Sequence, residues 1–410
     1  MEEQTNKKVK IAIIAPAILP IPAVKGGAIE TLTTYLIEEN EKNPRIDFTV
    51  FSPFCEEAQA VSRKYNYTRV EFVDFSSYVK KMDDFCCLWI RRLTLKSFTP
   101  VSYFMRRVNK YLKDVNFDYI LLEGNYFQMI QIPKKYKERC ILHLHTDCIH
   151  RETYRAKETL ESFRNIFVIS KFLGNSILTI SNKIESKIKL LKNTVDQNCF
   201  SVQSTDEFRK SFRKKYDISD DEIVLIFCGR LDPGKGIKEL LLALKDVPNC
   251  RLVIVGASWF SSNKQTDFVR EIKEISKLIE DRVIYTGYVP HEEVGLYYSV
   301  GDIGVFPSIC NEAAGLVIIE AMAVGLPVIT TNKGGIPEYV TNDSCILLEV
   351  DNFLVDNLKI AITSLIEDSE LRLRMSRAAL ENAKKYNTQV YFDNFCALID
   401  SCQSEKEGNI

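Results

Sequence analysis

The segment from Val305 to Glu338 constrains the fold of this chain more than any other stretch. It begins as a short apolar strand and passes through a loop at 307–315 into an apolar helix that starts at Leu316. Gly325 ends that helix, since glycine suits the position after a helix, and a second apolar strand starts at Val328. This succession of strand, loop, helix and strand predicts an α/β unit with a buried sheet.

Two carboxylates bracket the start of this helix. Glu312 lies in the loop, and Glu320 lies within the helix, about 7 Å beyond Gly315 along the axis. The first-turn N–H groups between them have no helical partner and form a site for an anion. A ligand with a central diphosphate and hydroxyl groups at both ends fits this pattern, and a nucleotide-sugar has that shape.

Each glutamate taken alone is more simply explained as a solvated surface residue. Glu320, however, is embedded in the apolar run Leu-Val-Ile-Ile-Glu-Ala-Met-Ala. A carboxylate in such a helix must be paired or used by a ligand, because burying an unpaired charge is costly.

The residues around the two glutamates resemble a known signature. Glu312, seven residues, Glu320 and then Gly-Leu-Pro-Val, followed by a Gly-Gly-Ile-Pro-Glu tail, are similar to the glutamate pair of family-4 glycosyltransferases. That resemblance implies a retaining enzyme of the GT-B fold, with donor contacts at Ala314, Gly315 and Leu316. The chain departs from the family in Glu312-Ala-Ala-Gly, where glycine or serine and then an aromatic residue or proline are usual.

Length and composition agree with two domains of ordinary size. The chain has 410 residues, and strand–helix alternation recurs in both halves. We therefore expect two doubly wound, Rossmann-like α/β domains facing across a cleft, at residues 1–200 and 201–386. By resemblance, a helix at about 387–405 packs back on the first domain. Twelve cysteines without a CxxC motif, no signal peptide and no membrane span favour a cytoplasmic protein.

Two features of the first half resemble parts of the family's cleft. Gly26 and Gly27 precede a helix and permit close backbone approach to a phosphate or sugar; this loop lacks the G-x-G-x-x-G pattern of nicotinamide enzymes. His143 and His145 alternate on one face at the end of an apolar strand. His143 is most simply a core residue, whereas His145 resembles the histidine that contacts the donor sugar. With four histidines in the chain, we expect no metal site.

The second half adds two cations and an aromatic residue. Arg230 and Lys235 flank a turn after an apolar strand, and Gly-Arg-Leu-x-x-x-Lys-Gly resembles the family's phosphate-binding element. As isolated residues they would be surface charges, but together they can neutralise a diphosphate leaving group. Tyr288 follows another strand, at a turn that lies beside the nucleotide base in the family. The predicted catalytic residues are therefore Glu312, His145, Arg230 and Lys235.

Residues 79–113 combine many lysines and arginines with aromatic residues, and they are expected to be helical. Contact with anionic lipid or a lipid-linked acceptor and a plain domain-surface helix pair are equally compatible with this pattern. Nucleic-acid binding is a poorer third interpretation, because no recognised motif accompanies the charge and the net charge is −1.

The sequence favours a transferase that moves a sugar from a nucleotide-diphosphate sugar to a glycan or lipid-linked acceptor. The resemblance implies retention, and bacterial capsule or other cell-surface polysaccharide synthesis is the expected setting. No D-x-D motif is present, so we expect cationic side chains to replace a metal ion and no cofactor to be needed. The alternatives are a GT-B nucleotide-sugar 2-epimerase, which would need no acceptor, and a non-catalytic or coat-associated sugar-nucleotide-binding protein.

Overall fold

The computed structural model describes residues 8–74, 77–93, 101–200, 206–257 and 266–407. Its contacts divide the chain into two compact units. The first unit comprises Met1–Lys192 together with Thr388–Ile410, and the second comprises Asn193–Asn387. The second unit therefore lies, in sequence, between the two parts of the first.

The first unit contains a seven-stranded parallel sheet in the order β3-β2-β1-β4-β5-β6-β7. The strands are β1 Val9–Ile14, β2 Ile46–Pro53, β3 Thr68–Val73, β4 Tyr119–Glu123, β5 Cys140–Leu144, β6 Asn165–Val168 and β7 Ile188–Leu190. The order changes direction between β1 and β4. Open parallel sheets bind their ligands at the carboxyl ends of strands next to such a switch point.

Helices surround this sheet, as the near-continuous apolar strands require. They are α1 Ala28–Lys42, α2 Glu56–Ser62, α3 Ser77–Leu93, α4 Tyr103–Asp114, α5 Phe127–Gln131, α6 Ala156–Ser162, α7 Lys171–Leu178 and α15 Thr388–Glu407, with 3₁₀ turns η1 Lys134–Arg139 and η2 Asn182–Lys187. The terminal helix α15 lies beside α1. Its Phe392 and Phe395 are fully buried against β-sheet residues such as Phe48.

The second unit contains a six-stranded parallel sheet in the order β10-β9-β8-β11-β12-β13. The strands are β8 Ile223–Cys228, β9 Cys250–Val255, β10 Val283–Gly287, β11 Ile303–Phe306, β12 Val328–Thr331 and β13 Cys345–Leu348. Its helices and 3₁₀ turns are α8 Asp206–Lys215, η4 Pro233–Lys235, α9 Ile237–Leu244, α10 Asp267–Ser276, η5 Lys277–Arg282, α11 His291–Val300, α12 Leu316–Val324, η6 Ile336–Glu338, α13 Leu354–Glu367, α14 Ser369–Ala383 and η7 Lys384–Tyr386. The switch point lies between β8 and β11.

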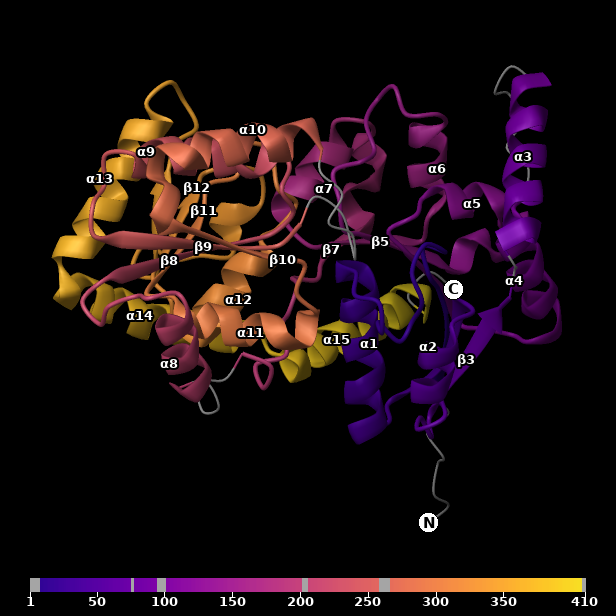
Figure 1. Ribbon diagram of the computed structural model, residues 1–410. Helices are drawn as coiled ribbons and strands as arrows, with labels where there is room; N and C mark the ends of the chain where they lie inside the picture. The colour runs from indigo at the N-terminus through magenta and orange to yellow at the C-terminus, as the bar shows by residue number, and fades with distance from the viewer. Residues whose placement is uncertain (1–7, 75–76, 94–100, 201–205, 258–265, 408–410) are drawn as a thin grey trace, which may run out of the picture. The chain divides into compact units, whose positions relative to one another are not determined.

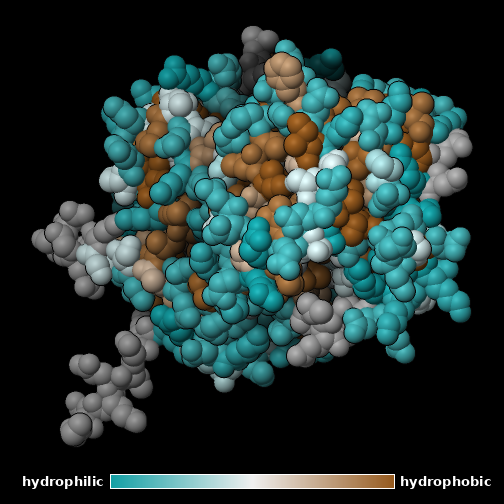
Figure 2. Space-filling view, turned by 90° about the vertical axis from the view of Figure 1, so that its left-hand side faces the viewer, coloured by the Kyte–Doolittle hydropathy of each residue, from teal (hydrophilic) through white to brown (hydrophobic). Residues whose placement is uncertain are grey.

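Two apolar clusters cover the two faces of the second sheet. Helices α9, α10 and α13 pack on one face, and α8, α11, α12 and α14 pack on the other (Figure 1). The face of the molecule seen in Figure 2 is mainly hydrophilic, with apolar patches between the polar side chains. The expected doubly wound α/β architecture is thus confirmed.

Three local features complete the description of the elements. Helix α10 ends at Ser276 and continues as the 3₁₀ turns of η5, because Ile279 has non-helical φ and ψ angles. The short edge strand β13 was not predicted. The basic stretch at residues 79–113 is helical as expected and forms two helices, α3 and α4; its residues 94–100 lie outside the described part of the chain.

Candidate functional site

Three loops meet at the carboxyl edge of the second sheet. The β8–α9 loop, which carries Arg230 and Lys235, is bonded to the β11–α12 loop because the Gly234 carbonyl accepts from Ile309 N (2.9 Å) and Cys310 N (3.2 Å). Gly236 has φ +70°, and a Cβ there would overlap the Pro307 carbonyl. Only glycine therefore fits this close crossing of two loops.

The third loop, between β12 and η6, fixes the backbone of Glu312. Gly335 N donates to the Glu312 carbonyl at 2.7 Å. Gly334 has φ +58°, and a Cβ there would overlap the same carbonyl. The Gly-Gly pair seen in the sequence thus positions Glu312 from a neighbouring loop.

The side chain of Glu312 lies against a cation. Lys235 Nζ is 2.5 Å from Glu312 Oε1, and Ser308 Oγ donates to the same oxygen at 2.7 Å. Arg230 is half exposed and pairs with Asp232 at 3.1 Å. The structure thus brings together Lys235 and Glu312, two of the residues predicted from separate motifs.

Helix α12 begins directly after this ion pair. Ala314 precedes the N-cap Gly315, and Leu316 opens the first turn, where Gly315 O accepts from Ile318 N and Ile319 N. No side chain in the described ranges caps this helix. Its first-turn N–H groups are therefore available to an anion, next to Lys235 and Glu312.

Glu320 is only 6% exposed, and two side chains of α11 hold it. Tyr298 Oη donates to Glu320 Oε2 at 3.0 Å, and His291 Nε2 lies 3.3 Å from Glu320 Oε1. Burial lowers the pKa of His291, but the hydrogen bond and negative charge of Glu320 outweigh it and raise that pKa above its ordinary value. The buried carboxylate is thus paired, as the apolar helix required, and sequence reasoning had not identified either partner.

Tyr288 lies on a different loop of the second unit. It follows β10 directly and is 38% exposed. Gly256 N donates to Gly287 O at 3.0 Å, which ties the ends of β9 and β10 together. No contact between Tyr288 and the Lys235–Glu312 pair is found among the described residues.

The first-unit candidates lie at the carboxyl edge of the other sheet. Gly26 and Gly27 have φ values of +72° and +101°, and Gly27 is the N-cap of α1. Behind them Glu30 is buried, and a Cβ at Gly27 would overlap its carboxylate. Burial raises the pKa of Glu30 to about 7, and the charge of Glu123 adds to this effect.

His145 belongs to a buried cluster that the sequence had not revealed. Its Nε2 lies 2.7 Å from Glu123 Oε2, and His143 Nδ1 lies 3.1 Å from the same oxygen. The ligand atoms of all three residues lie within 4.8 Å of one another, so they are the described residues that could hold a metal ion. The expectation of a metal-free protein stays a prediction.

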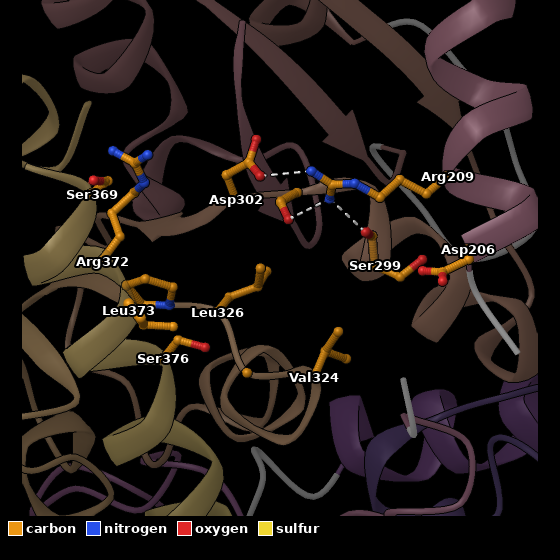
Figure 3. A pocket seen from close by; sticks show the side chains of 13 residues that line it. Asp206, Arg209, Ser299, Asp302, Val324, Leu326, Ser369, Arg372, Leu373 and Ser376 are labelled. Atoms are coloured by element: carbon orange, nitrogen blue, oxygen red, sulfur yellow. Dashed lines mark hydrogen bonds and ion pairs between the residues drawn. The ribbon is translucent and has the colours of Figure 1, made fainter. Parts of the chain in front are cut away.

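A pocket of about 380 Å³ opens at the other end of the second sheet, where β11 and β12 begin (Figure 3). Arg209 there bonds the carbonyls of residues 299–301 and pairs with Asp302 at 2.7 Å. Arg372 donates to the carbonyls at the end of α13. Both arginines are thus occupied by structural contacts, and the pocket contains none of the predicted site residues.

Most of the second unit matches a known family of enzymes. Residues 208–382 match the family model described as glycosyl transferases group 1. These residues are a group 1 glycosyltransferase domain. The matched region contains every second-unit candidate, from Arg230 to Glu320, whereas Gly26, Gly27 and His145 lie outside it.

Relatives and solved structures agree with this family. The chain is 27% identical over 399 residues to the Bacillus subtilis (strain 168) protein named as glycosyltransferase YtcC, covering 92% of this chain and 87% of the relative. It is 26% identical over 388 residues to spore coat protein SA of the same strain, covering 92% and 94%. Anabaena HepE in complex with UDP and glucose matches with a TM-score of 0.71 at 17% identity, covering 96% of this chain and all of that one. The chain thus has the GT-B fold.

Proposed function

We propose that this glycosyltransferase moves a sugar from a nucleotide-diphosphate sugar to a glycan or lipid-linked acceptor, with retention, in bacterial cell-surface polysaccharide synthesis. The observation that carries the proposal is the placement of Lys235 and Glu312 beside the uncapped start of α12. The UDP and glucose bound by HepE, and the spore coat name of one relative, support the donor class and the setting.

Each group at this edge has a chemical role in the proposed reaction. Arg230, Lys235 and the first N–H groups of α12, at Gly315 and Leu316, stabilise the charge that develops on the departing diphosphate. Glu320, oriented by α11, accepts hydrogen bonds from the ribose, and Glu312 accepts them from the sugar hydroxyls.

The transfer itself exchanges one bond at the anomeric carbon for another. The bond from that carbon to the diphosphate oxygen breaks, and a bond to the acceptor oxygen forms on the same face. The acceptor's proton passes to the departing diphosphate, so no carboxylate nucleophile is required. Same-face substitution gives retention, which analysis of the product's anomeric configuration tests directly.

Substitution of the donor site tests the assignment. Lys235→Ala and Glu320→Ala should each lower transfer by at least about 100-fold, since each removes a charged contact to the donor. Lys238→Ala is the matched control, because Lys238 forms an ion pair with Glu271 on the surface of the same unit. Near-normal turnover in either site variant, with the unfolding temperature unchanged, would exclude the assignment.

Thermal unfolding against UDP-, GDP-, TDP- and ADP-sugars identifies the donor. A ligand that binds the native state raises the unfolding midpoint by mass action. We expect a shift with one nucleotide family that is lost in Glu320→Ala. Donor binding without turnover on any acceptor would instead favour a non-catalytic coat protein, and isomerisation without acceptor would identify an epimerase.

We propose that the reaction needs no divalent metal ion, because Arg230 and Lys235 supply positive charge at the diphosphate position. Transfer should therefore continue after the protein has been dialysed against a chelator. Loss of activity that added magnesium or manganese restores would contradict this proposal.

The exposed residues of helix α3 support the proposal that the protein contacts the inner face of the membrane peripherally. None of its described side chains is buried, and large apolar residues recur on one stripe at helical spacing: Tyr78, Met82, Phe85, Trp89 and Leu93. Among the residues that the structure describes, no helix has the length and apolar content needed to cross a bilayer. This stripe therefore suits insertion at a bilayer surface rather than a membrane span.

The positive charges of α3 and α4, and the way in which α3 is attached to α4, agree with binding to a lipid surface. Asp83, on another side of α3, pairs with Arg106 of α4 at 2.6 Å, so α3 is attached through its polar residues. Besides Arg106, the exposed cations among the described side chains of these two helices suit anionic lipid, and they are Lys81, Arg92, Arg107, Lys110 and Lys113.

Sedimentation with lipid vesicles tests this contact. Binding should be stronger to vesicles with anionic lipid than to purely zwitterionic ones, and Phe85→Glu with Trp89→Glu should abolish it. Phe353→Glu, which alters an exposed aromatic residue of the second unit, is the matched control. Equal sedimentation of all three proteins would contradict the role of α3.

A further inference from the structure

Glu123 is the last residue of β4 and stands in register with His143 on β5. Its carboxylate is 1% exposed and contacts both imidazole rings, whose centroids are 4.0 Å apart. Since His145 follows the end of β5, the strand pairing itself brings one buried acid to both histidines. None of the roles assigned above to the donor-site residues uses this acid.

The protonation states in this cluster follow from its burial and contacts. Burial would raise the pKa of Glu123, but the charge and hydrogen bond of His143 and the hydrogen bond of His145 outweigh it and lower that pKa to about 2. Burial and the charge of His143 together lower the pKa of His145 to about 4, although the hydrogen bond and charge of Glu123 raise it. At neutral pH, Glu123 is therefore a carboxylate and His145 is a neutral imidazole.

A carboxylate only accepts hydrogen bonds, so each ring nitrogen that faces Glu123 must carry its proton. For His145 that nitrogen is Nε2, at 2.7 Å. A neutral imidazole has a single N–H, and therefore Nδ1 of His145 has a free lone pair. Within the described ranges, this buried nitrogen has no hydrogen-bond partner.

We propose that Glu123 is a positioning residue that holds His145 as its Nε2–H tautomer, so that Nδ1 accepts a hydrogen bond from a substrate hydroxyl. The substrate part of this inference rests on the proposed sugar transfer. An unpaired acceptor in a buried place is costly, and a sugar hydroxyl has the donor that would satisfy it. Glu123 acts through His145 and does not itself touch the substrate.

Two other titratable groups interact with Glu123, and a third glutamate of the first unit serves as a control. His143 shares the Glu123 carboxylate, and Glu30 of α1 interacts with it electrostatically. Glu39 offers a matched control, because it is another buried glutamate of the first unit. It bonds Lys42 and Thr388 rather than a histidine.

The substitution Glu123→Gln has a specific consequence for tautomers. The amide keeps one acceptor oxygen and replaces the other with an NH₂ group, which only donates. If the NH₂ group faces His145, Nε2 must become the acceptor and the proton must move to Nδ1.

Nuclear magnetic resonance of protein with ¹⁵N-labelled histidine measures this directly, whether or not sugar transfer occurs. Four histidines give a spectrum that single substitutions can assign. In the wild type we expect His145 protonated at Nε2 and bare at Nδ1, and in Glu123→Gln a changed tautomer of His145 or of His143. A wild-type His145 protonated at Nδ1, or a tightly bound metal ion in the purified protein, would overturn the inference.

Enzyme kinetics distinguish a Glu123 that positions His145 from a Glu123 that only stabilises the fold. Glu123→Gln should lower kcat/KM for transfer by at least about tenfold, while Glu39→Gln stays near wild type. Glu123→Gln added to His145→Ala should cause no further loss, because the two residues act through one contact. Additive losses in the double variant would show that Glu123 acts apart from His145. An inactive wild type would count against the sugar-transfer proposal alone, since the tautomer measurement does not depend on turnover.

Discussion

Lys235 and Glu312 form an ion pair in the second unit, and this pair bears on how a diphosphate would bind at the proposed donor site. In the proposed donor site, a diphosphate would replace Glu312 as the partner of Lys235, whose Nζ lies 2.5 Å from the carboxylate. The exchange weakens net binding of the diphosphate, because one ion pair is lost as another forms. It also frees Glu312 to accept hydrogen bonds from the sugar.

Glu312→Gln should therefore separate binding from transfer. The substitution removes the competing negative charge, so free nucleoside diphosphate should bind several-fold more tightly while transfer falls at least about tenfold. Calorimetric titration with the diphosphate and turnover of the complete donor measure the two effects. Glu349→Gln, on the surface of the same unit, controls for net charge. Weaker diphosphate binding in Glu312→Gln would contradict the competition.

Glu30 should make the first unit less stable as the pH rises. Its pKa is about 7 in the folded protein against an ordinary value of 4.5, so the folded state keeps a proton that the unfolded state loses. The contribution of Glu30 to the stability of the folded state is fully present below pH 4.5 and is lost as the pH rises through about 7. Glu30→Gln should gain up to about 3 kcal/mol relative to wild type between pH 4.5 and pH 8. Denaturant unfolding at both pH values measures the difference in the free energy of unfolding between Glu30→Gln and wild type. The same difference at both pH values would contradict the prediction.

At the scale of elements, the loops of the second unit depend on glycines at close crossings. Gly236→Ala should destabilise the second unit by more than about 3 kcal/mol, because a Cβ would overlap the Pro307 carbonyl in addition to the left-handed strain. Gly26→Ala is the matched comparison, since Gly26 has a similar φ of +72° and a Cβ added there would meet no atom within 4 Å. It should cost about 1–2 kcal/mol. Equal losses in chemical denaturation would show that strain alone acts at both positions.

Much of the element order could be predicted from the sequence, but the partners of the site residues could not. Apolar strands followed by glycine-rich turns identified both sheets and placed Lys235 and Glu312 at strand ends. The partner of His145 depends on which strand pairs with β5, and the order β4-β5 is a property of the complete sheet. The sequence signal for Glu123 was its position, because it is a carboxylate at the end of the apolar run Tyr-Ile-Leu-Leu-Glu. His291 and Tyr298 likewise reach Glu320 only because α11 packs beside α12.

At the scale of the whole molecule, α15 should decide the stability of the first unit. A chain that ends at Asn387 lacks the buried Phe392 and Phe395, and each such loss alone costs about 3–5 kcal/mol. The total approaches the stability of an ordinary domain. Calorimetry should show the first unit's transition lost while that of residues 193–387 persists. A first unit that unfolds at its normal temperature without α15 would contradict this.

The position of α15 at the end of the chain also fixes an order of events during synthesis. Residues 193–387 emerge from the ribosome as a complete unit, whereas residues 1–192 still lack the helix that covers Phe48 and Phe167. At roughly 5–20 residues per second, the 195 intervening residues (387 − 193 + 1) take about 10–40 s to make. The unit that is translated first is thus completed last. Throughout that interval its exposed apolar face is a target for chaperones.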